Sequence, residues 1–186
     1  MKLDTPNQLS RATLALHWVV GLTMIGLLAL GVYMVELETR SLYFWHKSFG
    51  FVIFFVIVMR VVWRLKNGWP TPVGEYRHIQ HLVAKSVHWA LLLGSIFMPI
   101  SGFLMSSLGG HGVEVFGLEI VTRNPDPENP RKVLPYNEAF GILFHSIHHW
   151  LGYFVIATLA LHISGALKHH LVDKDSTLKR MLGAKI

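Results

Sequence analysis

Four long apolar stretches dominate the chain, and polar or proline-containing segments separate them. The stretches cover about residues 12–35, 44–64, 86–107 and 144–167. A helix needs about 20 mostly apolar residues to cross a bilayer, so each stretch is long enough to span one. The first is too long for a signal peptide, and no small-residue cleavage site followed by a soluble domain accompanies it. The pattern predicts an all-α membrane protein, a four-transmembrane-helix bundle forming one domain over residues 1–186.

The longest connection covers residues 108–143. It contains the pair Gly109-Gly110 and three prolines between residues 124 and 130. Prolines at this density interrupt regular structure. We therefore expect an ordered irregular loop here, without a fifth span.

Basic residues are distributed unevenly among the segments that connect the spans. Eleven Lys and Arg residues lie in three of these segments: the N-terminal piece, which holds Lys2 and Arg11, the second connection and the C-terminal tail. The first and third connections carry five, alongside seven acidic residues. Short segments rich in Lys and Arg stay on the cytoplasmic side, so both termini are expected to be cytoplasmic. The net charge of +6 thus reflects topology, with membrane lipid and not nucleic acid as the expected partner.

The composition narrows the chemistry. Apolar residues make up 52% of the chain and charged ones 15%, well below the share of about 25% in a soluble domain. The chain has no cysteine, which excludes disulfide frameworks, thiolate zinc sites, iron–sulfur clusters and covalently attached c-type haem. What remains is a membrane protein with 12 histidines.

Four of these histidines lie inside the spans at two matched depths. His17 and His162 are near the ends expected to be cytoplasmic, and His46 and His148 are near the opposite ends. His148 and His162 are 14 residues apart, which puts them within about 40° of one helix face and about 21 Å apart along the axis. A lone histidine near a helix end is more often interfacial or hydrogen-bonded. Two matched pairs instead predict two stacked sites, His17 with His162 and His46 with His148.

Two facing imidazoles favour haem b over zinc. Zinc usually takes four ligands, and no other ligand side chain lies at either depth in the right place. Haem b needs two axial imidazoles, which the facing helices of a bundle can supply. Glycines in the spans would let a broad ring approach the backbone, although close helix packing explains them equally well. These glycines are Gly21, Gly50, Gly94 and Gly152.

Three further residues are candidates around the cytoplasmic-side site. Arg60 follows His46 by 14 residues, and its charge would suit a haem propionate, with snorkelling toward the interface as the alternative. Arg11 and His88 are candidates for the same haem or for a quinone headgroup, and a structural role for His88 fits equally well. The remaining loop and interface histidines are expected to be solvated: His78, His81, His111, His169 and His170.

Taken together, several short segments resemble the bacterial cytochrome b561 family, the dihaem four-helix proteins of the inner membrane. The resemblance covers nearly the whole chain. The segments that carry it are residues 16–18, 46–50, 60–64, 88, 98–102, 148–153, 162, 167–170 and 173–181.

The resemblance implies electron transfer through two b haems, between a periplasmic-side donor and a quinone such as ubiquinone or another acceptor. It implies the same axial pairs as the depth argument, and a location in the bacterial inner membrane. Some members of the family are thought to pass electrons from superoxide to ubiquinone, and the connection over residues 108–143 shows no substrate motif.

Two other functions compete with this interpretation. The chain could be a haem-bearing anchor subunit that docks a periplasmic dehydrogenase or hydrogenase through its outer connection. It could also be a divalent-metal transporter using the same histidines. A transporter would be expected to carry carboxylates within its spans, and none lies in the core of any of the four.

Overall fold

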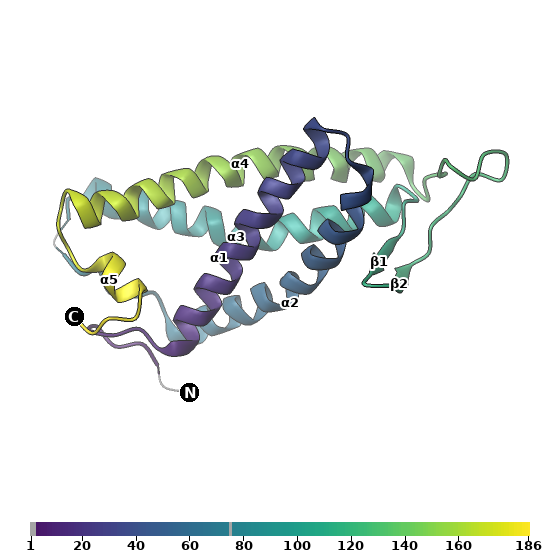
Figure 1. The fold of residues 1–186 in the computed structure, drawn as a ribbon. Helices are drawn as coiled ribbons and strands as arrows, with labels where there is room; N and C mark the ends of the chain where they lie inside the picture. The colour runs from purple at the N-terminus through teal and green to yellow at the C-terminus, as the bar shows by residue number, and fades with distance from the viewer. Residues whose placement is uncertain (1–2, 75) are drawn as a thin grey trace.

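The computed structural model describes residues 3–74 and 76–186, so Lys2, counted above among the basic charges, lies outside it. Its long helices are α1 (Arg11–Glu36), α2 (Tyr43–Asn67), α3 (His78–Leu108) and α4 (Glu138–Leu171) (Figure 1). A 3₁₀ turn, η1 (Arg40–Leu42), precedes α2, and a short helix, α5 (Thr177–Met181), follows α4. All four long helices are apolar enough to cross a membrane. The prediction of four long apolar helices is confirmed.

Two helices extend well beyond the predicted apolar stretches. α3 begins at His78 instead of about residue 86, and α4 begins at Glu138 instead of about residue 144. Both first turns are capped by side chains: Asn137 accepts a hydrogen bond from the backbone N–H of Phe140, and the side chain of Gln80 accepts one from the backbone N–H of Arg77. Hydropathy marks only the apolar part of a helix, so it misses these extensions.

The helices pack as consecutive neighbours, and α1 contacts α2, α2 contacts α3, and α3 contacts α4 along much of their lengths. A small core that includes Val20, Ile57 and Val155 lies among them. Many large apolar side chains remain exposed, as expected for helices whose outer faces contact lipid. By contrast, α1 and α2 each make few close backbone contacts with α4.

The connection between α3 and α4 is more regular than predicted. It forms an antiparallel hairpin of β1 (Val113–Val115) and β2 (Leu118–Val121), visible beside the start of α2 in Figure 1. The tip residues Phe116 and Gly117 both have positive φ, 50° and 91°, as a two-residue hairpin turn of type I′ requires. The expectation of an irregular loop was therefore wrong for this part. The strands are too short to give a clear alternating pattern in the sequence.

Candidate functional site

The first histidine pair, here called the hairpin-end pair, joins α2 to α4. The ring centroids of His46 and His148 are 6.3 Å apart, and the ring planes are nearly perpendicular. The Nδ1 atom of His148 lies 3.0 Å from the carbonyl oxygen of Met98 and 3.1 Å from Oγ of Ser101. A proton on Nδ1 would satisfy both contacts and leave Nε2 with a free lone pair. This arrangement is what an imidazole needs to bind a metal ion.

The hairpin-end pair lies in the wall of an apolar cavity of about 410 Å³ that residues of all four long helices line. Two glycines touch the imidazoles directly. A Cβ atom on Gly102 would lie 2.9 Å from Cε1 of His148, and one on Gly31 would lie 3.4 Å from Cε1 of His46. The bare backbone at Gly102 thus lets the His148 ring lie where it does.

The second pair, here called the termini-end pair, joins α1 to α4 at the end of the bundle that carries both chain termini. The ring centroids of His17 and His162 are 6.2 Å apart, with ring planes at 57°. The sequence therefore predicted correctly which histidines lie together. That they ligate iron stays a prediction.

The separations of both pairs fit an ion held between two imidazoles. Two N–metal bonds of about 2 Å on opposite sides of one ion put ring centroids about 6 Å apart. At the hairpin-end pair, the 410 Å³ cavity leaves room between the helices that supply the two histidines. Among the described residues, no group of three His, Asp or Glu ligands includes either pair. The donor set therefore suits two axial ligands of haem iron better than a four-coordinate zinc ion.

His46 adds an independent observation. Its Nδ1 atom is buried, and no hydrogen-bond partner for it exists in the part of the chain that the structure describes. A buried polar atom without a partner is costly. With no hydrogen-bond partner for either ring nitrogen among residues 3–74 and 76–186, the His46 imidazole is free to bind a metal ion through one of them.

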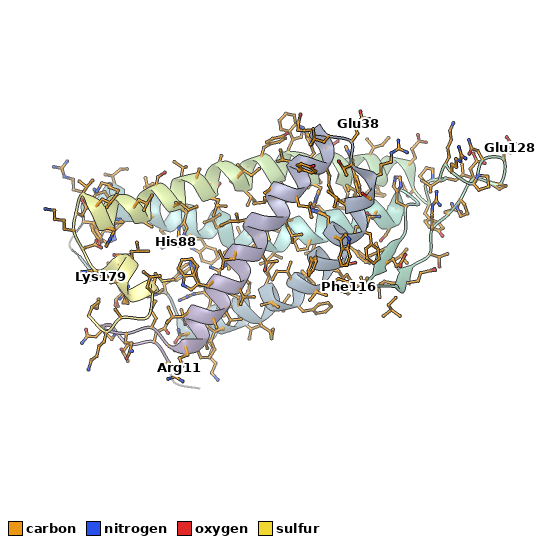
Figure 2. The ribbon with its side chains drawn as sticks, in the orientation of Figure 1. Arg11, Glu38, His88, Phe116, Glu128 and Lys179 are labelled. Atoms are coloured by element: carbon orange, nitrogen blue, oxygen red, sulfur yellow. The ribbon has the colours of Figure 1, made fainter. Side chains whose placement is uncertain are left out.

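His88 lies beside the termini-end pair (Figure 2). Its ring centroid is 5.2 Å from that of His162, edge to face, which is closer than two imidazoles on opposite sides of one metal ion. Its Nδ1 atom is 2.6 Å from the carbonyl oxygen of Ala84 in its own helix, and its ring also contacts Trp69. His17 is therefore the better partner for His162, with His88 next to the site.

The two candidate arginines are placed differently. Arg60 is half-buried and within electrostatic range of His17, His88 and His162. It makes no hydrogen bond or ion pair with the described residues, so its guanidinium is available to an anionic group. Arg11 is the exposed first residue of α1 (Figure 2), and no contact joins it to the histidines described above.

The four glycines predicted to admit a ring differ in the space beside their backbones. A Cβ on Gly94 would lie 2.7 Å from Val155, which identifies Gly94 as a contact between α3 and α4. Gly152 has only ordinary contact distance to Met98. Gly21 and Gly50 have open space beside them, and Gly50 also lines the 410 Å³ cavity.

The other histidines do not approach the two pairs as ligands. His145 and His149 are exposed and lie parallel to each other one turn apart on α4. His78, His81 and His111 are exposed, as expected. His169 is not simply solvated, because its Nδ1 lies 2.8 Å from Asp173 and 3.3 Å from Asp175.

Burial lowers the pKa of His111, and the charges of Lys47 and Arg123 lower it further. Nζ of Lys47 donates a hydrogen bond to the carbonyl oxygen of Gly112, 3.0 Å away, and Lys47 also lines the cavity. Positive charge is therefore concentrated locally around His111, within connections whose acidic residues outnumber the basic ones.

The sequence analysis did not identify Ser101, Gly102 or Trp69 as site residues. Ser101 and Gly102 follow Met98 by one turn on α3, within a segment that carried the family resemblance. Their contacts with His148 depend on how α3 packs against α4, which no spacing within one helix reveals.

Comparison with known proteins gives consistent matches over nearly the whole chain. A family model described as prokaryotic cytochrome b561 matches residues 8–184. Cytochrome b561 homolog 2 of Escherichia coli (strain K12) is 34% identical over 185 residues, which cover 97% of this chain and 94% of that protein. Cytochrome b561 homolog 1 of the same organism is 24% identical over 95% of this chain and 97% of its own length. The probable superoxide oxidase CybB of Yersinia pestis is 27% identical over 92% and 94%.

Proposed function

Because the chain belongs to the prokaryotic cytochrome b561 family, we propose that it carries electrons across the bacterial inner membrane through two haem b groups. The donor would be on the periplasmic side and the acceptor a quinone, with ubiquinone as the first candidate. The observation that carries this proposal is the presence of two imidazole pairs, each at a metal-bridging separation and at opposite ends of one bundle.

Bound haem b supplies a one-electron carrier, because its iron alternates between two oxidation states. His17 and His162 would hold the haem at the termini end, and His46 and His148 the one at the hairpin end. Ser101 and Met98 fix the orientation of the His148 ring. Arg60 would lie beside the termini-end haem and stabilise its ionised propionates.

The proposed topology has both termini in the cytoplasm and the hairpin in the periplasm. The excess of Lys and Arg in the termini and in the connection between α2 and α3 supports it. Lys47 and Arg123 then lie on the donor side, where their charges around His111 would favour an anionic donor at that point of the surface. One similar protein is named a probable superoxide oxidase, and superoxide is such an anion. Superoxide is therefore one donor worth testing.

Electron flow through the chain alone can be measured in vesicles that contain only this purified protein. Ferricyanide is trapped inside, dithionite is added outside, and an ionophore prevents a membrane potential. We expect the trapped ferricyanide to be reduced in these vesicles, and to stay oxidised in protein-free vesicles and in vesicles with His17→Ala. Equal slow reduction in all three would contradict the proposal. Co-purification of a dehydrogenase or hydrogenase, with no transfer by the chain alone, would favour the anchor-subunit function.

A further inference from the structure

The β1–β2 hairpin is fixed to the start of α2 by buried polar contacts. Ser48 is fully buried, and its Oγ accepts a hydrogen bond from the backbone N–H of Phe116 at 3.1 Å. The same hydroxyl lies 3.4 Å from the carbonyl oxygen of Glu114. Lys47 donates to Gly112 just before β1. The hairpin therefore holds a defined position against α2.

Three aromatic side chains gather where the hairpin tip meets α2: Trp45, Phe49 and Phe116, here called the aromatic patch. The ring of Phe116, labelled in Figure 2, lies 5.2 Å from that of Phe49 and 6.1 Å from that of Trp45, centroid to centroid. Each of the three side chains is still 46% to 49% exposed. The tip thus presents a large aromatic surface that nothing in the described chain covers.

The aromatic patch continues a lipid-facing stripe of α2. Going along the helix from Trp45 and Phe49, the exposed apolar residues recur every three or four positions and so share one face. They are Val52, Phe55, Met59 and Val62, each 44% to 60% exposed. In a membrane span such a face contacts hydrocarbon chains. Trp45 and Phe49 occupy the first two turns of this span, the depth at which tryptophan side chains such as Trp45 concentrate in membrane proteins.

From this continuity we propose that the hairpin tip is a membrane anchor, with Phe116 inserted into the interfacial layer of the bilayer beside Trp45 and Phe49. The partner is lipid and not another protein, because the patch shares its face with helix residues that lipid must cover. Leu118, which follows the tip and is 66% exposed, would lie in the same layer. By holding the tip in the interface, the anchor would keep the hairpin against Lys47 and Ser48 of α2.

Because the chain has no cysteine, a single spin label can test the depth of the tip directly. Phe116→Cys would be labelled with a nitroxide in the full-length protein, reconstituted in vesicles of phosphatidylethanolamine and phosphatidylglycerol. Leu118→Cys is a second site that leaves the aromatic patch intact. Glu128→Cys, in the exposed part of the same connection (Figure 2), is the aqueous control, and Phe55→Cys is the control in hydrocarbon.

Power saturation would compare collisions with oxygen, which dissolves in lipid, and with a water-soluble nickel chelate. At residues 116 and 118 we expect the ratio of oxygen to nickel collisions to be several-fold higher than at residue 128 and lower than at residue 55. A ratio equal to that at residue 128 would place the tip in water and overturn the proposal. Low collision rates with both reagents would indicate burial against protein and would also overturn it.

Discussion

At the scale of single residues, the position of the His148 ring depends on what lies beside it on α3. Ser101 and Met98 hold its Nδ1, and the absence of a side chain at Gly102 leaves space for the ring. A Cβ atom 2.9 Å from Cε1 is closer than packed atoms tolerate, so either the ring or α3 must move.

We predict that Gly102→Ala weakens haem binding at the hairpin end and leaves the termini-end haem in place. The absorption spectrum of the purified variant should show loss or perturbation of one haem component. Gly26→Ala is the matched control, because nothing lies within 4 Å of the Cβ it would add. A Gly102→Ala protein with the parent spectrum would mean that the His148 ring has more freedom than the packing indicates.

Arg60 allows a second prediction at this scale. A positive charge near a haem favours the reduced form, which carries one positive charge less, so Arg60→Gln should lower the potential of the termini-end haem. For a charge partly screened by water we expect an effect of about 1 kcal/mol, or about 40 mV for one electron. Redox titration with the two haems resolved spectrally measures it.

Two comparisons define the Arg60 result. The hairpin-end haem should keep its potential in the same sample, and Arg60→Lys should retain more of the termini-end potential than Arg60→Gln, because it keeps the charge. If both midpoints of Arg60→Gln match those of the parent, Arg60 is an interfacial anchor with no role at the haem.

At the scale of elements, the 14 residues between His148 and His162 on α4 could be interpreted from the sequence as two positions on one helix face, because helical periodicity is regular. This spacing correctly grouped His148 with His46 and His162 with His17. Helix ends and the hairpin were harder to predict, because capping by Asn137 and the φ angles at Phe116 and Gly117 leave little trace in hydropathy. The contacts of Ser101 with His148 depend on packing between helices and could not be predicted at all.

The C-terminal segment shows how an element outside the spans is held. Asp175 accepts a hydrogen bond from the hydroxyl of Tyr76, and Arg180 donates to the carbonyl oxygens of Pro6 and Thr71 at 2.9 and 2.8 Å. Trp18 donates to the carbonyl oxygen of Met181. These contacts join α5 to the termini end of the bundle, close to the start of α1.

We predict that α5 loosens in acid. Burial opposes ionisation of Asp175, but hydrogen bonds from Tyr76 and Thr177 outweigh it and lower its pKa below the usual 3.8. Because the folded-state pKa is the lower one, the stabilisation is complete above the unfolded value and is lost as the pH falls through the folded value. Hydrogen exchange of residues 177–181, corrected for the intrinsic effect of pH, should therefore rise only below about pH 4. In Tyr76→Phe the pKa of Asp175 should move back toward its unfolded value, so exchange should already be faster at neutral pH and its rise in acid should be smaller; identical profiles would exclude Tyr76 as the cause.

At the scale of the whole molecule, the four helices leave α4 separated from both α1 and α2, and the two histidine pairs bridge these separations. The sequence could predict which residues share a depth, but the separation of the helices follows from side-chain packing throughout the bundle. The 410 Å³ cavity beside the hairpin-end pair is the space in which a chain of 186 residues could hold one large prosthetic group.

The most direct test of two haem b sites in one chain is a pyridine haemochrome assay with an independent count of protein. We expect two haems per parent chain, one in His17→Ala, one in His148→Ala and none when both are changed. The parent spectrum should be that of a low-spin haem with two imidazole ligands. One haem per parent chain, a largely high-spin spectrum, or loss of both haems in each single variant despite normal folding would contradict two independent sites.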